Sequence, residues 1–526
     1  MRLNDRLCLY RKMTGVSCIK EKSKYAFERA KQFYFMLWCK ESLIYLLFSV
    51  LVTWCCGYTV KNALGNVLIL FLMMLLGRRN VISATCVSIF LLLSAFYAPV
   101  GMIYGKINNS FIASVMQTNI NEAGEFITGI PVLYFIVSLV IAVFTFWFWR
   151  KRDKSHRGFI FLLFFIVLSV NAWPKRMVTN VMTGIAETRE EMMRYESLKN
   201  NQKDSWDIVS VEKKYKTIII VIGESVRRDY LSVYGYPLPT TPWLNSAPGI
   251  FINGYFSAAP NTIGSLSRTL TLDYTETGNP GNNIVTLARK AGYETWWISN
   301  QGSLGQHDTL ISVIAANADK KHFLKEGSSS SLRIDDEDML QYVREAVNSS
   351  SPKVIFIHML GSHTNPCDRL FNDAQPFREL FGKKISCYLS TLLKLDRFLQ
   401  AIYNMTTEHG DDFAMLYFSD HGQSVSSDST PVHHAPGLRS GYDVPLMMMA
   451  SDITEHHLNH VHISARRFPE IFQWLTGIQT KNLPLSFSLL QNDFAESVFV
   501  FNGERDVPVL SLPEEPILTG NVESEK

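Results

Sequence analysis

The sequence predicts a multi-domain protein in which an N-terminal bundle of five transmembrane helices precedes a C-terminal α/β domain with a mostly parallel sheet covered by helices. Three observations lead to this prediction. Charged residues are depleted between about residues 41 and 173 and return to an ordinary frequency afterwards. Five apolar segments lie inside the depleted block. Beyond it, continuous apolar strands alternate with helical patterns, which is typical of a sheet buried on both faces.

The five apolar segments cover residues 41–60, 63–77, 81–104, 131–149 and 158–173. A membrane helix needs roughly 20 apolar residues, within a range of about 17–25. The first, third and fourth segments reach this length, whereas the second and fifth are short and would borrow flanking residues. The segments carry almost no charge, so neither a buried soluble core nor a single signal peptide explains them.

Basic residues predict the orientation of these spans. Residues 1–40 carry ten Lys and Arg against three acidic residues, and further basic residues follow the second and fourth segments. By the positive-inside rule these regions lie in the cytoplasm. An odd number of spans then places everything after about residue 174 outside. The expected parts are a tail (1–40), a membrane domain (41–173) with an external loop (105–130), a linker with a surface helix (174–215), the exported domain (216–505) and a C-terminal tail (506–526).

Composition and cysteine usage agree with an exported globular domain. The chain has 47% hydrophobic and 19% charged residues, which excludes a disordered or collagenous protein. A net charge of +3 gives no reason to expect a nucleic-acid partner. Six of the eight cysteines lie in the tail or the membrane segments, and only Cys367 and Cys387 lie in the exported part. This favours one disulfide, the alternative being two buried thiols.

The exported part alternates strands and helices. Strands are predicted at 216–222, 294–299, 353–360, 413–420, 444–450 and 497–501. Helical patterns lie between them at 282–291, 336–348, 381–404 and 464–476. The acidic, proline-containing tail after about residue 505 is expected to be loosely held.

Three predicted strands end in residues that could bind a metal ion. The first runs into Glu224, another into His363, and a third into Asp420 and His421. Ligands gather beyond the carboxyl ends of parallel strands, so these side chains are expected side by side. Carboxylates with imidazole suit zinc, and less specifically manganese. Asp420 and His421 can share a metal only if the chain turns there, which Gly422 permits. Taken singly, Glu224 could be a helix-terminus acid and His363 a structural histidine.

At this point the sequence resembles the bacterial phosphoethanolamine transferases, membrane members of the alkaline phosphatase/sulfatase superfamily. The resemblance covers nearly the whole chain and rests on VIGESVRRDYLSVYGYPLPTTPWL (221–244), PNTIGSLSRTLT (260–271), ETWWISNQ (294–301), HMLGSH (358–363) and YFSDHG (417–422). The PxTxxSLxxxL form at 260–270 is similar to the branch that modifies periplasmic glucans or lipopolysaccharide core. It is less similar to the form found in enzymes that modify lipid A.

The resemblance implies a threonine nucleophile at Thr262 and a catalytic zinc held by Glu224, Thr262, Asp420 and His421, with a second zinc as an option. Coordination to a divalent cation favours the alkoxide of a hydroxyl and offsets charge on phosphoryl oxygens. The implied reaction takes phosphoethanolamine from phosphatidylethanolamine, through a covalent threonine intermediate, to a glycan or lipopolysaccharide acceptor. It also implies a monomer in the bacterial inner membrane, in contact with membrane lipid, with the catalytic domain in the periplasm.

Further positions carry over from the family. His363 and His434 match histidines near the phosphate or a second metal, with His433 leaving the latter ambiguous by one residue. Asn300 matches a residue near the substrate. In the external loop, Thr118 and Glu122 match a pattern linked to the ethanolamine head group. Ser114 shares their helical face and stands where the family often has asparagine. The alternative for this loop is an interfacial helix with an exposed glutamate.

Four other functions compete with this one. A sulfatase would need a CxPxR or SxPxR motif, which the sequence lacks. A phosphoglycerol transferase is chemically close, but the Glu122 carboxylate favours a cationic head group. A membrane-anchored binding protein without catalysis is the non-enzymatic alternative, and the intact set of candidate ligands argues against it. A transporter would need ionisable residues inside its spans, and essentially only Glu41 is present, at an end.

Overall fold

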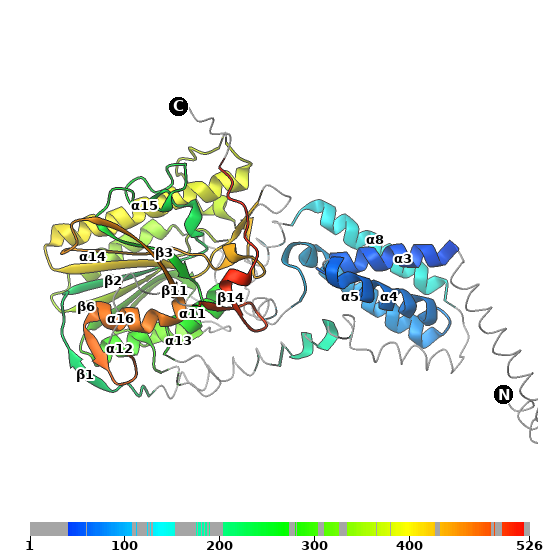
Figure 1. Ribbon diagram of the computed structural model, residues 1–526, viewed down its shortest axis with the longest axis horizontal. Helices are drawn as coiled ribbons and strands as arrows, with labels where there is room; N and C mark the ends of the chain where they lie inside the picture. The colour runs from blue at the N-terminus through cyan, green and yellow to red at the C-terminus, as the bar shows by residue number, and fades with distance from the viewer. Residues whose placement is uncertain are drawn as a thin grey trace, which may run out of the picture. The chain divides into compact units, whose positions relative to one another are not determined.

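The computed structural model divides the chain into two compact units, one apolar and helical and the other α/β (Figure 1). It describes residues 40–58, 60–107, 130–152, 203–272, 281–302, 310–325, 334–363, 365–378, 380–426, 432–484 and 497–519, together with isolated positions between these ranges.

Four of the five predicted membrane segments are helical in the described part of the chain. They are α3 (Lys40–Cys55), α4 (Val60–Gly77), α5 (Val81–Tyr104) and α8 (Val132–Arg150). Among the described residues, α5 and α8 are long and apolar enough to cross a membrane, and the apolar parts of α3 and α4 are shorter. The fifth segment, 158–173, lies outside the described residues. The number of five spans therefore stays a prediction.

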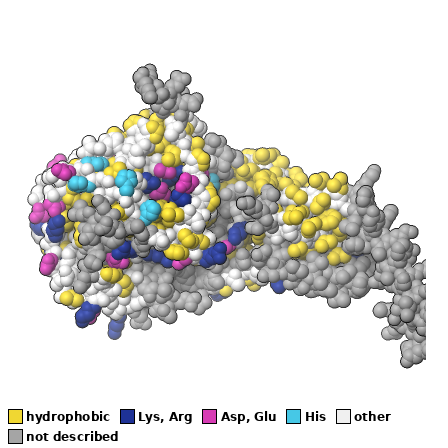
Figure 2. Space-filling model, viewed as in Figure 1, with side chains coloured by type: hydrophobic (Ala, Val, Ile, Leu, Met, Phe, Trp, Pro, Cys, Tyr) yellow, Lys and Arg dark blue, Asp and Glu magenta, His cyan; other side chains and the backbone are white. Residues whose placement is uncertain are grey.

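The helical unit has an apolar surface. Large hydrophobic side chains such as Phe96, Leu139 and Val143 are exposed, and hydrophobic side chains gather on this unit in Figure 2. Such a surface is costly in water and favourable in lipid. Glu41 forms an ion pair with Arg78, and both side chains are partly exposed, so the one acid of the predicted spans is paired.

The α/β unit is built on an eight-stranded sheet, in the order β11-β3-β10-β7-β2-β6-β4-β5. The strands are β2 (Thr217–Gly223), β3 (Gly249–Phe256), β4 (Glu294–Gly302), β5 (Lys320–Lys325), β6 (Lys353–His358), β7 (Phe413–Ser419), β10 (Leu446–Ala450) and β11 (His456–Ser464). Only β10 pairs antiparallel with its neighbours in this sheet, and the other pairings are parallel. The sheet is thus mostly parallel, as predicted.

Both faces of the sheet are covered, which explains the continuous apolar strands. In the fully buried β2, Ile218, Ile220 and Ile222 enter one core, and Ile219 and Val221 enter the other. In Figure 1 one face carries α14 and α15, and the other carries α11, α12, α13 and α16. These helices are α11 (Thr262–Thr269), α12 (Ile284–Lys290), α13 (Leu310–Ala316), α14 (Leu340–Val347), α15 (Lys383–His409) and α16 (Phe468–Thr476).

Some elements differ from the expectation. The strands β3, β5 and β11 and the helices α11 and α13 were not predicted. The expected strand at 497–501 is β13 (Phe499–Phe501), which pairs with β14 (Asp506–Pro508) apart from the main sheet. Within the expected linker, β1 (Ile208–Val211) pairs with β12 (Ile478–Thr480).

The C-terminal tail is held to the α/β unit as far as residue 519, so the expectation of a loose tail is wrong there. Arg227 forms an ion pair with Glu515, 2.6 Å between Nη1 and Oε2. The Leu518 N–H donates to the Tyr230 hydroxyl, and the Tyr236 hydroxyl donates to the Leu518 carbonyl. A few polar side chains of the α/β unit hold the tail through these contacts, and the composition of the tail does not reveal them.

Candidate metal centre

Glu224 and Asp420 meet because β2 and β7 are parallel neighbours. Gly223, the last residue of β2, pairs with Ser419, the last residue of β7. The next residue in each strand's direction is a carboxylate, and both carboxylates are about 1% exposed. The strand β6 lies on the other side of β2 and leads towards His363. The three strand ends therefore lie at one edge of the sheet, as the sequence predicted.

The chain after β2 bends sharply and fixes both carboxylates. Ser225 has a φ of 62°, in the left-handed region that non-glycine residues rarely adopt. Its N–H donates to Asp420 Oδ1 at 3.1 Å, and its hydroxyl donates to Glu224 Oε1 at 2.7 Å. Ser225 is a site residue that sequence reasoning missed, because a backbone conformation leaves no signature in a single sequence.

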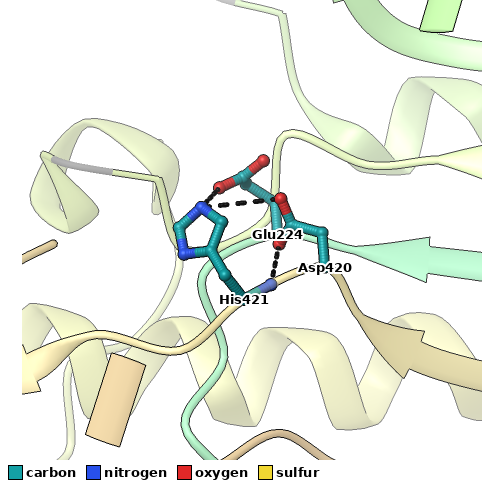
Figure 3. Close-up of side chains that lie close together, drawn as sticks. All are labelled: Glu224, Asp420 and His421. Carbon is teal, nitrogen blue, oxygen red and sulfur yellow. Dashed lines mark hydrogen bonds and ion pairs between the residues drawn. The ribbon is translucent and has the colours of Figure 1, made fainter. Parts of the chain in front are cut away.

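His421 completes a cluster of three buried groups, drawn in Figure 3. Its Nε2 lies 3.1 Å from Glu224 Oε1 and 3.5 Å from Asp420 Oδ2. One ligand atom from each of the three residues lies within 4.8 Å of the others. The other ring nitrogen, Nδ1, lies 2.8 Å from the Gly422 carbonyl, which fixes the orientation of the ring. Such a partner on the second nitrogen is usual for a histidine that binds metal.

Gly422 is required for a different reason from the one expected. It does not adopt a left-handed conformation. Instead, a Cβ at this position would lie 2.1 Å from the Ser440 carbonyl oxygen. The glycine therefore allows two backbone segments to approach closely behind His421.

The charges of the cluster are strongly coupled. Burial opposes the charge on Glu224, but the charges and hydrogen bonds of neighbouring groups, led by His421, hold the pKa of Glu224 well below its usual range. Burial, with the Glu224 charge, raises the pKa of Asp420. Burial would lower the pKa of His421, but the carboxylates of Asp420 and Glu224 outweigh it and raise that pKa. Two carboxylates in one buried site need added positive charge, which protons or a cation can supply.

The surroundings of two atoms in the cluster are better explained by a bound cation than by a complete set of hydrogen bonds. Asp420 Oδ2 and His421 Nε2 are buried and, apart from the ion-pair contacts within the cluster itself, have no hydrogen-bond partner among the described residues. Buried polar atoms normally have hydrogen-bond partners. An acceptor that lacks one and faces the other two groups of the cluster therefore indicates a site for a bound cation. Two carboxylates and one imidazole form a donor set that zinc accepts.

Thr262 lies at the open side of this cluster. It is the first residue of α11, and Asn261 caps the helix by accepting from Gly264 N–H at 2.8 Å. The Thr262 hydroxyl donates to Glu224 Oε2 at 3.0 Å. The first N–H groups of a helix have no partners within it and carry a partial positive charge. An anionic group next to Thr262 would therefore be stabilised.

Two of the expected histidines border the cluster. The His434 ring centroid is 4.6 Å from that of His421, and its Nδ1 lies 3.3 Å from the Pro260 carbonyl. The His363 ring centroid is 6.4 Å from that of His434. His433 belongs to β9 (Val432–His433), and the ring of His434 is the one whose contact with His421 is described; which of the two takes part in the site stays a prediction.

Asn300 has a clear role within the fold. It is fully buried at the end of β4, and its amide nitrogen donates to Ile334 and Asp336. The Asp336 carboxylate accepts from the N–H groups of Leu360 and Gly361. This arrangement holds Gly361 against Glu224, so Asn300 supports the site from behind. Its contact with substrate stays a prediction.

Of the remaining expected residues, the two cysteines are described and the three residues of the external loop are not. Cys367 and Cys387 form a disulfide with 4.9 Å between their Cα atoms. Ser114, Thr118 and Glu122 lie outside the described residues, so their part in head-group binding stays a prediction.

Comparison with known proteins identifies the family. The family model described as Sulfatase matches residues 216–478, and the model described as Phosphoethanolamine transferase EptA/EptB matches residues 66–188. The chain is 30% identical over 490 residues to phosphoethanolamine transferase OpgE of Escherichia coli, which covers 87% of this chain and 92% of that protein. It is 23% identical over 488 residues to phosphoethanolamine transferase CptA of Salmonella typhimurium, covering 80% and 82%.

Solved structures agree at the level of the fold. The integral membrane phosphoethanolamine transferase EptA of Neisseria meningitidis matches with a TM-score of 0.57 and 16% identity, over 84% of this chain and 95% of that one. The zinc complex of the C-terminal periplasmic domain of EptC from Escherichia coli matches with a TM-score of 0.52 and 21% identity, over 58% and 97%. The chain therefore belongs to the phosphoethanolamine transferase family of the alkaline phosphatase/sulfatase superfamily.

Proposed function

We propose that the protein transfers phosphoethanolamine from phosphatidylethanolamine to a periplasmic glycan or a lipopolysaccharide, through a covalent intermediate on Thr262. The observation that carries this proposal is the hydrogen bond from the Thr262 hydroxyl to Glu224, at 3.0 Å. It sets a nucleophile against the buried cluster of Glu224, Asp420 and His421, at the N-terminus of a helix.

The cluster is suited to hold zinc. Glu224, Asp420 and His421 would supply three ligands, and the Thr262 oxygen would complete the set. The unpaired Asp420 Oδ2 and His421 Nε2 support this assignment. A bound divalent cation lowers the pKa of a coordinated hydroxyl and offsets charge on phosphoryl oxygens. The related EptC domain of Escherichia coli, similar in fold, was solved as a complex with zinc, which also supports the choice of metal.

In the first half-reaction, Thr262 Oγ1 attacks the phosphorus of phosphatidylethanolamine. A bond forms between Oγ1 and phosphorus, and the bond from phosphorus to the diacylglycerol oxygen breaks. The hydroxyl loses its proton and the departing diacylglycerol oxygen gains one, so protons balance. The first N–H groups of α11 begin at Thr262, and their partial charge would stabilise anionic phosphoryl oxygens bound beside it. We assign His434 and His363 to contacts with the same phosphoryl group.

In the second half-reaction, an oxygen of the acceptor attacks the phosphorus. The acceptor–phosphorus bond forms, the bond to Oγ1 breaks, and Thr262 regains a proton. The two substrates thus react in turn at one nucleophile, which predicts ping-pong kinetics.

We place the protein in the bacterial inner membrane, with the α/β unit in the periplasm. The match of the EptA/EptB family model over residues 66–188 and the apolar helices α5 and α8 support this location. In the loop at 105–130, Glu122 would pair with the ammonium group of the donor, beside Thr118 and Ser114. The protein is expected to act as a monomer.

The direct test is to trap the intermediate. Purified protein is incubated with phosphatidylethanolamine carrying an isotope-labelled head group, and peptides are analysed by mass spectrometry. We expect a labelled phosphoethanolamine increment on the peptide that contains Thr262, and its disappearance when acceptor is added. An increment on another residue, or none with an active preparation, would contradict the mechanism. Mass spectrometry of periplasmic glucans, core oligosaccharide and lipid A from deletion and complemented strains then identifies the acceptor.

A further inference from the structure

The C-terminal segment of the described chain lies across the loops that carry the proposed zinc ligands. We call residues 509–519 the C-terminal clasp. Its central residue is Glu515, whose side chain is only 9% exposed although it belongs to an otherwise acidic and exposed tail. A carboxylate is rarely buried unless it is paired, so its partners indicate what the clasp does.

One oxygen of the Glu515 carboxylate binds the loop that follows β2. Arg227 lies three residues after Glu224 and is 2% exposed. Its Nη1 lies 2.6 Å from Glu515 Oε2, and its Nη2 donates to the Glu515 carbonyl at 3.0 Å. The other carboxylate partner of Arg227 is Asp229, with 2.8 Å between Nη2 and Oδ2.

The same carboxylate also binds the loop that follows β7. The hydroxyl of Ser424 donates to Glu515 Oε1, and the N–H of Val425 donates to Oε2 at 3.2 Å. Ser424 and Val425 lie three and four residues after His421, and both are buried. A single side chain therefore connects the loop of Glu224 with the loop of Asp420 and His421.

Neighbouring clasp residues hold a third segment that packs behind the centre. The Arg439 N–H donates to the Pro513 carbonyl at 2.9 Å, and its guanidinium donates to the Leu510 carbonyl at 3.1 Å. Arg439 begins the short 3₁₀ helix η5 (Arg439–Gly441), and the Gly441 carbonyl accepts from the Gly422 N–H at 3.0 Å. The clasp thus also contacts the segment whose Gly441 carbonyl binds Gly422, the residue after His421.

We propose that Glu515 is a positioning residue for the metal centre, which sets the spacing of the Glu224 loop and the Asp420–His421 loop through Arg227 and Ser424. The inference rests on the proposed zinc site and adds to it a group that contacts neither metal nor substrate. Groups that orient metal ligands typically change metal affinity by about 10–100-fold when they are removed. We therefore expect that removing the Glu515 carboxylate lowers the affinity of the protein for zinc.

The test measures zinc affinity of the full-length protein in detergent. The protein is stripped with a chelator and titrated with zinc against a fluorescent competitor, and its thermal midpoint without metal is recorded. Glu515→Ala should weaken zinc binding at least about tenfold. Glu515→Gln should recover part of the affinity, because the amide oxygen can still accept from Ser424 or Val425. Glu514→Ala is the matched control: that neighbouring carboxylate is 74% exposed and pairs with Arg439, and affinity should stay unchanged.

The outcomes separate this inference from the zinc site itself. If Glu515→Ala folds and binds zinc as tightly as the unaltered protein, the positioning role is overturned. If Glu515→Ala does not fold, Ser424→Ala replaces it, with at least a threefold loss of affinity expected and no loss overturning the role. A Glu224→Gln arm reports on the proposed function: if that variant also binds zinc normally, the zinc site is wrong. If Glu224→Gln loses zinc and Glu515→Ala keeps it, the zinc site stands and only the positioning role of Glu515 is overturned.

Discussion

The hydroxyl of Thr262 donates a hydrogen bond to Glu224, with 3.0 Å between Oγ1 and Oε2. The two residues come from different elements, the start of α11 and the loop after β2. Their contact links the proposed nucleophile to the buried cluster, and the first prediction follows from it.

Removing the Thr262 hydroxyl should abolish transfer. Thr262→Ala should lower the rate by at least about a thousandfold, since the proposed covalent intermediate forms on this hydroxyl. Thr262→Ser should keep part of the activity and move the labelled adduct to serine. Transfer is measured as label appearing in the acceptor. Thr269→Ala, at the far end of the same helix, is the matched control and should stay active, because its hydroxyl donates to the Ser265 carbonyl within that helix. Full activity of Thr262→Ala would contradict the proposed mechanism.

Replacing Asp420 should release the metal. Asp420→Asn keeps the shape of the side chain but removes a charge, so zinc should bind at least about a hundredfold more weakly. Metal content after dialysis, measured by mass spectrometry, checks this. Asp452→Asn is a suitable control, because Asp452 also follows a strand of this sheet. That strand, β10, runs in the opposite direction, so its end lies at the other edge. Equal zinc in both variants would argue against Asp420 as a ligand.

Gly361 should tolerate no side chain. Its φ is 51°, and a Cβ there would lie 2.8 Å from the Glu224 carbonyl oxygen. Left-handed backbone costs a non-glycine residue about 1–2 kcal/mol, and the close contact adds to that. Gly361→Ala should therefore lower both the unfolding midpoint and zinc affinity. Gly437→Ala is the control, because a Cβ at that position meets nothing within 4 Å. Equal effects of the two substitutions would contradict this account.

Asp396 should make stability depend on pH. Its carboxylate accepts from the N–H groups of Trp243 and Leu244, and burial raises its pKa to about 6. The folded state therefore binds a proton more tightly than the unfolded state. This contribution is full below about pH 4, falls as pH rises towards 6, and is lost above that, up to about 3 kcal/mol in all. The stability difference between the unaltered protein and Asp396→Asn should shift by this amount between pH 4 and 7. A difference that is constant over this range would refute the assignment.

The sequence predicted the mostly parallel sheet and the meeting of the three candidate ligands from one physical rule. Buried parallel strands are continuously apolar, and each ends where its first polar residue emerges, so Glu224, Asp420 and His421 could be located at one sheet edge. The strands β5 and β11 were missed because they lie at the edges of the sheet. Half-exposed edge strands such as HHLNHVHIS have no apolar run to recognise.

Other parts of the site had no local signal. Thr262 is one threonine among several, and only the family resemblance singled it out. Ser225, Gly361 and Asp336 act through backbone conformation and hydrogen bonds to distant segments, which a single sequence does not display. The C-terminal clasp was mistaken for a loose tail because it contains two prolines, two glutamates and no continuous apolar run. Its attachment depends on partners almost 300 residues earlier in the chain, since Arg227 and Glu515 are 288 residues apart.

The position of β2 between β6 and β7 also determines when the centre can form. Ser225 and Asp420, which share a hydrogen bond, are 195 residues apart in the chain. During synthesis, the Glu224 loop must therefore wait until most of the α/β unit has been made before its partner carboxylate exists. A nascent or prematurely terminated chain contains Thr262 but lacks Asp420 and His421, so under the proposed mechanism it cannot attack membrane lipid before the domain is finished.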